Sequence, residues 1–448
     1  MLPTHRLLRS QLDTVIENKA AQGHKSEGLK EELDGLPDSY DALAAFAHKL
    51  SDLPIRDDWP YVEPNGLDAI WAECDPHRPT DTVGSVDLAD SAKRVEAAFL
   101  SSVCGCILGK PLEVNPTLAE IRKAAESVGE WPLRDYIPEK LLTPLGRRHS
   151  SWAETVRDRI AYVAPDDDLN YNVLGMLILE DHGIGFTKAQ LMGKWTRHLP
   201  ITTTFGPERT LLLKAGMHTL ARGEDPDFDA WVSVLNPKDE FCGALIRADA
   251  YGYACSGRPA LAAELAWRDA SWTHRRTGIY GTMFVAAAIA CAQAITDRLG
   301  IFETALKFIP QRSRFYKIAS DSLNEVGQAS DWLDGYARIH GKYRAYTHCQ
   351  IYQEVGTLMN TLRFAEDIGD GICKQVSQGN DTDSFGTTAG SLLGAYFGPG
   401  ALEDRWLTPF NDDLHTGLAW FFDRSLSSVT QRMTALPEKV AAELAKAG

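Results

Sequence analysis

The sequence predicts a mainly α-helical protein. Apolar residues recur at helical spacing, convincing alternating strands are absent, and glycine and proline mark the ends of the periodic runs. One apolar stripe runs from Tyr40 to Leu50, and Leu169–Leu177 repeats the pattern with Gly183 as a C-terminal stop. Further helices are expected at Leu261–Trp267, Tyr280–Ile295, Ile351–Phe364 and Pro437–Lys446, the last with proline at its favoured first position.

The first 90 residues differ from the rest of the chain. Three short amphipathic segments are separated by the polar turn Gln22–His24 and by Gly35–Pro37. A proline-rich stretch at residues 53–66 and a polar stretch at Asp75–Asp90 follow. We therefore expect a boundary near residue 90, between an N-terminal helical extension (1–90) and one long helical array (91–448).

The composition is that of a soluble globular protein. The chain has 448 residues, 44% of them hydrophobic and 24% charged, which allows a large core and one to three domains. Its formal charge of −15 argues against non-specific nucleic-acid binding, which needs a positive field. It does not exclude a nucleotide ligand that is held locally.

The cysteines and the N-terminus indicate a cytoplasmic protein with no membrane partner. The eight cysteines form no CxxC pair, and most lie in apolar surroundings, so we interpret them as small core residues in a reducing compartment. The N-terminus lacks the apolar core of a signal peptide. The longest apolar candidate, Met283–Ile295, is too short to span a membrane.

Two aspartate clusters, each at the start of an expected helix, are the most informative feature. The first is Asp166–Asp168, and the second is Asp381–Ser384, which contains Asp383. Helix capping needs one aspartate, and acidic residues in the first turn add about 0.3–1 kcal/mol each. Capping alone accounts for either cluster taken singly, but three aspartates in a row exceed that need.

Together, the two clusters predict a site for hard divalent cations. If the fold brings them into one place, each pair of charges 4 Å apart repels by about 4 kcal/mol at an effective dielectric near 20. Cations would relieve this repulsion. Ligands that are all oxygen select Mg²⁺, Mn²⁺ or Ca²⁺ over zinc or copper.

Glycines on the helix after the second cluster indicate close packing. Gly386, Gly390 and Gly394 fall on one stripe, and each costs about 1 kcal/mol relative to alanine inside a helix. Close approach of another backbone is the physical reason to tolerate them. We expect this helix to be central and its first turn to be rigidly held.

The segment Val103–Glu113 superficially suggests a phosphate-binding loop. Its spacing is GxxxGK, however, and Pro111 stands where serine or threonine would bind magnesium, so we reject that reading. We interpret the segment as a helix end that faces a cavity. Glu113 is then either a site residue or a surface acid.

These features together resemble the ADP-ribosylglycohydrolase family, which includes the dinitrogenase reductase-activating glycohydrolase. Its sequences contain a G-D-x-x-G-x-x-x-E stretch, an early T-D-D-T cluster, and a late G-x-D-T-D-[TS] cluster before a helix ending in G-A-Y-x-G. The similar segments here are Gly105–Glu113, Asp166–Leu169, Gly379–Ser384 and Gly394–Gly398. Gly243–Arg247 is similar to the family's G-A-A-M-R loop, and Ser271–His274 is similar to its S-x-x-T-H stretch.

The resemblance covers about residues 91–400 and has four departures. Cys106 replaces the usual aspartate, Asp166 and Leu169 stand where the family has threonine, and Cys242 precedes Gly243 where asparagine is common. Asp167, Asp168, Asp381 and Asp383 match, with Ser384 supplying the hydroxyl, so capacity for two metals looks intact.

The resemblance implies an all-α, multi-helix orthogonal bundle with a binuclear site. Its metals would be two Mg²⁺, or Mn²⁺, and Glu113 and Asp381 would be catalytic, with Glu113 the acid/base or a gate. The implied metal ligands are Asp166, Asp167, Asp168, Asp381, Asp383 and Ser384. The implied substrate-binding residues are Gly243, Arg247 and His274, although His274 could be a satisfied polar residue and Arg247 a salt-bridged surface residue near Asp249.

The implied activity is hydrolysis of the bond between ADP-ribose and a protein side chain, with arginine preferred and serine or small conjugates open. The implied partner is an ADP-ribosylated protein or another ADP-ribose conjugate. The alternative is an immunity or binding protein whose extension caps an ADP-ribosylating toxin. A structural calcium site of the EF-hand type is a weaker rival, because no segment has its ligand spacing.

Overall fold

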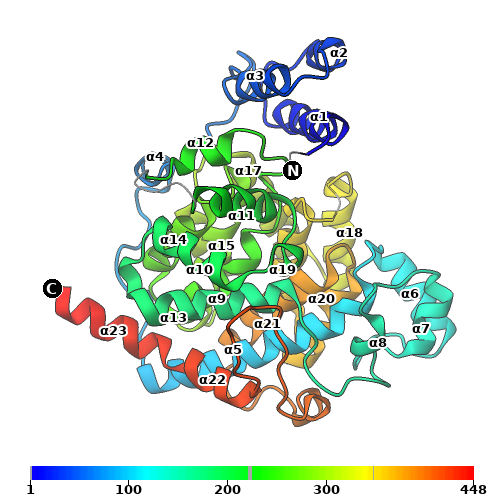
Figure 1. Ribbon diagram of the computed structural model, residues 1–448. Coiled ribbons are helices and arrows are strands. Elements are labelled where there is room, and N and C mark those ends of the chain that lie inside the picture. The colour runs from blue at the N-terminus through cyan, green and yellow to red at the C-terminus, as the bar shows by residue number, and fades with distance from the viewer. Residues whose placement is uncertain (1–2, 220–224, 347, 448) are drawn as a thin grey trace.

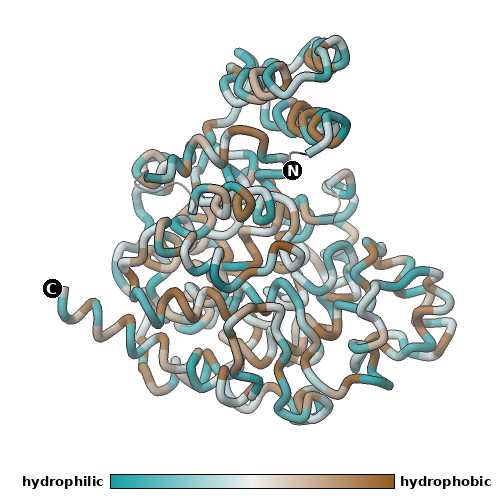
Figure 2. Tube along the Cα trace, in the orientation of Figure 1, coloured by the Kyte–Doolittle hydropathy of each residue, from teal (hydrophilic) through white to brown (hydrophobic). Residues whose placement is uncertain are grey.

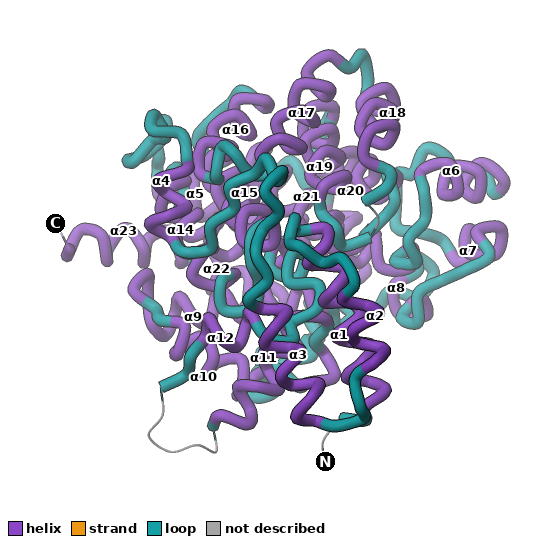
Figure 3. The backbone as a smooth tube through the Cα atoms, turned by 90° about the horizontal axis from the view of Figure 1, so that it is seen from above, coloured by secondary structure: helices purple, strands orange, loops and turns teal. Residues whose placement is uncertain are grey.

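Every regular element that the structure describes is helical (Figure 1, Figure 3). The computed structural model describes residues 3–219, 225–346 and 348–447. Within those ranges, β-structure is limited to isolated bridges, such as the one between Thr117 and Gly379. The prediction of an all-α fold is confirmed.

The helices are joined by loops and 3-10 turns, the longest of which connects α21 to α22. The first half of the chain contributes α1 (His5–Ala21), α2 (Leu29–Gly35), α3 (Tyr40–Ser51), α4 (Leu67–Glu73), α5 (Leu88–Gly109), α6 (Leu118–Ser127), α7 (Glu139–Leu145), α8 (Trp152–Thr155), α9 (Asp167–His182), α10 (Lys188–His198), α11 (Gly206–His218) and α12 (Phe228–Ser233). The second half contributes α13 (Asp249–Ala254), α14 (Pro259–Ala270), α15 (Thr277–Ala292), α16 (Arg298–Ala305), α17 (Arg314–Gln328), α18 (Trp332–Tyr343), α19 (Tyr352–Phe364), α20 (Ile368–Ser377), α21 (Thr382–Phe397), α22 (Leu426–Thr434) and α23 (Leu436–Ala447). The periodic runs all fall on helices, and α23 begins one residue before Pro437.

The N-terminal helices α1–α3 form a small layer on one side of the main body (Figure 1). They bury a hydrophobic cluster of their own, which includes Leu12, Leu43 and Phe46. Polar and apolar stretches alternate along these helices, as amphipathic helices require (Figure 2). The next helix, α4, contributes Ile70 to the main core instead. The domain boundary near residue 90 stays a prediction.

Helices α5 and α21 lie side by side near the centre of the main body (Figure 1). A Cβ atom added at Gly386 would lie 2.4 Å from the Gly105 carbonyl oxygen, and one at Gly390 would lie 2.1 Å from the Ser101 carbonyl oxygen. Gly109 likewise approaches the backbone of Thr382. The glycine stripe therefore lets two backbones touch, and this contact places the start of α21 against the end of α5.

The segment Leu88–Leu112 is long and apolar enough to cross a membrane by length and composition alone. In this fold, 89% of its most apolar window is buried inside the protein. We interpret it as the core helix of the bundle. This segment is longer than Met283–Ile295, which was expected to be the longest apolar candidate. Small and polar residues interrupt the apolar run of Leu88–Leu112, so its full length was not recognised.

Candidate active site

Three segments that are distant in sequence meet around the ammonium group of Lys110. This residue lies in the 3-10 turn η1 (Lys110–Leu112) directly after α5 and is only 7% exposed. Its Nζ lies 2.6 Å from Glu113 Oε2, 2.6 Å from Asp166 Oδ2 and 2.7 Å from Asp383 Oδ2. The two aspartate clusters therefore share one place, and a cation that belongs to the chain bridges them.

The starts of α9 and α21 hold the two clusters differently. Asp166 caps α9, because its Oδ1 accepts a hydrogen bond of 2.9 Å from the Asp168 backbone N–H. Asp381 stands at the capping position of α21 but makes no capping hydrogen bond with its side chain. Before it, Gly379 has φ +81°, and a Cβ there would lie 2.1 Å from the Pro116 carbonyl oxygen. The turn thus presses against Pro116, and the Asp381 side chain lines the cavity instead of capping the helix.

The electrostatics of the cluster centre on Lys110. Burial alone would lower the pKa of Lys110, but Asp166, Asp383 and Glu113 raise it well above its ordinary value. Burial opposes ionisation of Asp383, yet Lys110 lowers the pKa of that carboxyl to about 2. Burial and the neighbouring Asp383 charge raise the pKa of Glu113 to about 10. Lys110 thus favours the ionised form of Asp383, whereas burial and the Asp383 charge favour the protonated form of Glu113.

Two carboxylate oxygens in the cluster are buried with neither a hydrogen-bond partner nor an ion pair with Lys110 in the part of the chain that the structure describes. These are Asp168 Oδ1 and Asp383 Oδ1, on residues that are each 1% exposed. The other oxygen of Asp168 accepts a hydrogen bond of 3.3 Å from Ser384 Oγ. Burial raises the pKa of Asp167 and of Asp168 well above the usual range, and Asp166 adds to both shifts. Buried oxygens without partners, beside carboxylates that repel one another, are suited to bind a hard cation. Such a cation would add to the positive charge that the Lys110 ammonium already supplies.

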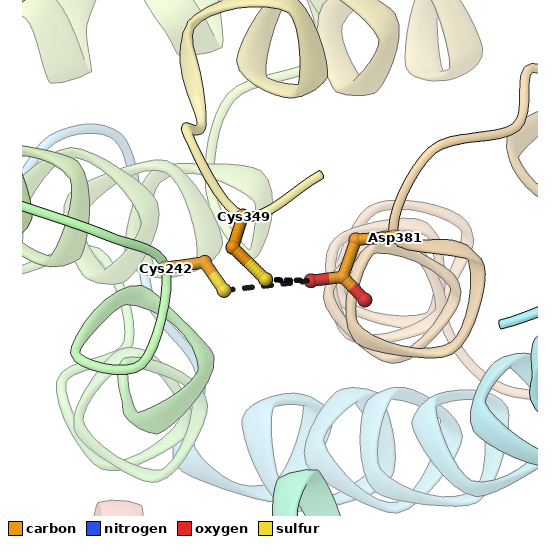
Figure 4. A group of neighbouring side chains, drawn as sticks. All are labelled: Cys242, Cys349 and Asp381. Carbon is orange, nitrogen blue, oxygen red and sulfur yellow. Dashed lines mark hydrogen bonds between the residues drawn. The ribbon is translucent and has the colours of Figure 1, made fainter. Parts of the chain in front are cut away.

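Asp381 lies against two thiols (Figure 4). Cys242 Sγ and Cys349 Sγ each donate a hydrogen bond of 3.4 Å to Asp381 Oδ2. Burial raises the pKa of Asp381 to about 6, against the opposing effect of His348, whose Nδ1 is 4.0 Å from Asp381 Oδ1. The Asp381 backbone N–H donates to Glu354 Oε1 at 3.0 Å.

A cavity of about 260 Å³ opens beside these groups. Its lining includes five residues of the predicted site, Glu113, Asp167, Gly243, Asp381 and Ser384. Tyr171, Phe205 and Phe241 add aromatic surface, and Glu208 adds a further carboxylate. Acids at one end and aromatic rings nearby suit a small polar ligand with one flat group.

Arg247 and His274 lie behind the wall of this cavity. Arg247 is 1% exposed and pairs with Glu208 Oε1 at 2.9 Å and Asp269 Oδ1 at 2.7 Å. The interpretation of Arg247 as a surface residue paired with Asp249 is wrong, because partners distant in sequence compensate its buried charge. His274 is fully buried, with its Nε2 3.5 Å from Glu208 Oε1, and burial followed by Arg247 lowers its pKa well below the usual range.

Four charged or titratable residues of this region were missed at the sequence level. They are Lys110, Glu208, His348 and Glu354. Lys110 was considered only within the rejected phosphate-loop reading, although its position three residues before Glu113 could have suggested a pair. The others carry no local signal, because their contacts join segments far apart in the chain.

The fold and the site define an all-α protein with a buried, oxygen-rich acidic cluster at a cavity. The family model described as ADP-ribosylglycohydrolase matches residues 87–443, and the chain belongs to this family. A solved structure described as an "ADP-ribosylglycohydrolase-related protein complex" is similar with a TM-score of 0.50 and 19% identity, over 79% of this chain and 99% of that chain. That likeness supports the fold alone. No match was found among curated proteins.

Membership of a glycohydrolase family makes this chain a hydrolase of the ADP-ribosylglycohydrolase type. It also confirms the resemblance noted from the motifs. The roles of the individual site residues stay predictions. Three of the departures lie at the cluster. Asp166 pairs with Lys110, Cys242 donates to Asp381, and the sulfur of Cys106 lies within 4.8 Å of oxygens of Asp166 and Asp168.

Proposed function

We propose that this protein is a divalent-cation-dependent hydrolase that releases ADP-ribose from a modified protein side chain, with arginine as the preferred acceptor. One observation carries the proposal. Carboxylates that follow η1 and that lie at the starts of α9 and α21 converge beside a cavity, and Asp168 Oδ1 and Asp383 Oδ1 are buried without hydrogen-bond partners among the described residues. The preference for arginine rests on the family resemblance, and no single residue carries it.

The acidic cluster is the proposed cation site. Asp166, Asp167, Asp168, Asp381, Asp383 and Ser384 would hold up to two Mg²⁺ or Mn²⁺ ions. A bound ion would supply Lewis acidity and lower the pKa of a bound water. Lys110 already neutralises one negative charge in the centre of the cluster, so the ions share these ligands with an ammonium group.

Glu113 is the proposed acid/base. It lines the cavity, and burial together with the Asp383 charge raises its pKa, which favours the protonated form. A protonated carboxyl can donate its proton to the leaving nitrogen or oxygen as the bond to the anomeric carbon breaks. The ionised Asp383, held 2.7 Å from Lys110 Nζ, is unsuited to that role.

Gly243 is the proposed contact for the substrate's phosphate side. A Cβ at this position would lie 2.2 Å from Glu208 Oε1, so no larger residue fits beside this carboxylate. Arg247 donates to the Gly243 carbonyl oxygen at 2.6 Å, and His274 lies against Glu208. In this proposal Arg247 and His274 are positioning residues that hold the Gly243–Glu208 wall in place.

The test is incubation with arginine-ADP-ribosylated and serine-ADP-ribosylated proteins, with and without EDTA, following released ADP-ribose. We expect release from the arginine-linked substrate that EDTA abolishes and Mg²⁺ restores. Asp383→Asn is the variant expected to be inactive, and Asp404→Asn, on an exposed 3-10 turn, is its control. Full turnover after thorough chelation would contradict the role of the cation, and no release from any ADP-ribose conjugate would contradict the hydrolase.

A further inference from the structure

We propose that Cys242, Cys349 and Asp381 form a separate binding site for a thiophilic divalent cation, with Zn²⁺ as the representative ion. The site lies in the wall of the cavity, next to the oxygen cluster. Because Asp381 belongs to both, an ion held by the thiols withdraws a ligand from the oxygen site. The binding is independent of the proposed hydrolase reaction, whereas its inhibitory consequence rests on that reaction.

The two sulfur ligands lie against the same side-chain oxygen, at the sulfur–oxygen spacing of a tetrahedral site (Figure 4). Each thiol sulfur is 3.4 Å from the same oxygen, Asp381 Oδ2, and one atom from each residue lies within 4.8 Å of the others. Metal–sulfur distances of about 2.3 Å and metal–oxygen distances of about 2.0 Å, at tetrahedral angles, place sulfur about 3.5 Å from oxygen and the sulfurs about 3.8 Å apart. The two observed sulfur–oxygen distances match this geometry, and the sulfurs lie within 4.8 Å of each other.

Backbone contacts hold the three ligands together in the absence of an ion. Cys242 N–H donates to the Cys349 carbonyl oxygen at 2.9 Å, which ties the two cysteine segments to each other. Cys349 has φ +66°, a left-handed conformation that fixes the direction of its side chain. Asp381 is fixed through its backbone N–H by Glu354. Such preorganisation is what a metal site requires.

The site is reachable and has an open fourth position. Both cysteines line the cavity, and Cys349 is half-buried. His348 Nδ1, 4.0 Å from Asp381 Oδ1, has no hydrogen-bond partner within the described ranges and is the nearest protein candidate for a fourth ligand. Otherwise a water or a substrate oxygen would fill that position, as in zinc sites with three protein ligands.

The chemistry of the ligands separates this site from the oxygen cluster. Two sulfurs select zinc-like ions, whereas carboxylate oxygens select Mg²⁺. Binding replaces two S–H bonds by two sulfur–metal bonds and releases two protons to solvent. The two thiolates, one carboxylate and the dication then carry a net charge of −1. The two neutral thiols and the ionised Asp381 carry the same net charge before binding, so Zn²⁺ there should inhibit by withdrawing Asp381 from the oxygen site.

The test uses the reduced, metal-stripped full-length protein in excess Mg²⁺, titrated with Co²⁺ as a spectroscopic probe and with Zn²⁺. Sulfur ligation gives a thiolate-to-cobalt charge-transfer band that ligation by oxygen alone does not. We expect one equivalent of Co²⁺ to produce the band and Zn²⁺ to displace it. The Cys242→Ser, Cys349→Ser double variant should lose the band and bind Zn²⁺ roughly 100-fold more weakly or worse, beyond what loss of an outer partner costs.

Two control variants distinguish the alternatives. Cys373→Ser, a buried cysteine on α20, should keep the band. Cys106→Ser should keep it too, because Cys106 lies with Asp166 and Asp168 and not with this triad. The proposal is overturned if the wild-type protein shows no band, if Cys106→Ser removes the band, or if Cys242 and Cys349 are joined as a disulfide after purification under mild reduction.

A second measurement keeps the proposal testable if the double variant does not fold. X-ray absorption of the zinc-loaded wild-type protein should show two sulfurs at about 2.3 Å and lighter atoms near 2.0 Å. A shell of oxygen and nitrogen alone would refute the site. Neither measurement needs substrate, so failure of the hydrolase proposal would leave the result readable.

Discussion

Replacing Lys110 by methionine should destabilise the metal-free protein and make it depend on Mg²⁺. Methionine has a similar length and fits the apolar stem, but it removes the ammonium that lies 2.6–2.7 Å from three carboxylate oxygens. At an effective dielectric near 20, one such pair is worth about 6 kcal/mol before desolvation. Removing one partner of a buried ion pair typically costs about 3–5 kcal/mol, and that is the fall in unfolding free energy expected here.

The assay is urea unfolding of wild type and Lys110→Met, with and without saturating Mg²⁺. In wild type the ammonium and the divalent ion share ligands, so the variant should bind Mg²⁺ more tightly and gain more stability from it. At a Mg²⁺ concentration 100 times the dissociation constant, the expected gain in unfolding free energy is about 2.7 kcal/mol.

Lys140→Met is the control. Lys140 pairs with Glu130 at 2.7 Å, but its side chain is 54% exposed, so loss of this pair should cost about 1 kcal/mol or less. Equal Mg²⁺ stabilisation of Lys110→Met and wild type would refute the idea that Lys110 and the ion compete.

Three further predictions follow from other parts of the structure. Gly390→Ala should lower the unfolding free energy, measured in urea, by about 1–3 kcal/mol or more, because the new Cβ would lie 2.1 Å from the Ser101 carbonyl oxygen. Gly193→Ala on α10 is the control and should be neutral or stabilising, because open space surrounds that position. Burial raises the pKa of Asp249 to about 7, so the folded state binds this proton more tightly than the unfolded state does. As the pH rises from about 4 to 7, the unfolding free energy of wild type should therefore fall by a few kcal/mol. Asp249→Asn, which can still accept the hydrogen bond from Ser391, should lack this part of the pH dependence in parallel unfolding curves. Glu113→Gln should lower kcat for ADP-ribose release by about 10²–10⁴ with little change in binding of free ADP-ribose, and unchanged kcat would exclude Glu113 as the acid/base.

Most of the fold could be predicted because its signal is local. Apolar periodicity predicted α9, α15 and α19, and the glycine stripe predicted the backbone contact between α21 and another element. The identity of that element, α5, had no local signal, because contact between Gly105 and Gly386 depends on the arrangement of the whole chain. Short helices such as α7 and α12 offer too few turns for a periodic pattern to be recognised.

The site could be predicted only where the sequence holds more polar residues than the local structure, such as a helix cap, requires. Asp166–Asp168 attracted attention because a cap requires one aspartate, and Asp166 is indeed the residue that caps α9. The sequence left Arg247 open between a substrate contact and a surface residue, because its partners, Glu208 and Asp269, lie about 20 to 40 positions away. The toxin-capping alternative gains no support from the arrangement of α1–α3 or from the comparisons.

The charge of the cluster explains why its location was easier to predict than its ions. Six acidic side chains gather there, Glu113, Asp166, Asp167, Asp168, Asp381 and Asp383. The only positive group that touches three of them in the described structure is Lys110, so burial and the remaining repulsion together raise the pKa of Glu113 and Asp167. A sequence reveals the surplus of carboxylates, but the number of ions they need depends on how many charges the fold itself supplies. Because Lys110 supplies one, the cluster can be compensated by fewer ions than its carboxylates alone would suggest.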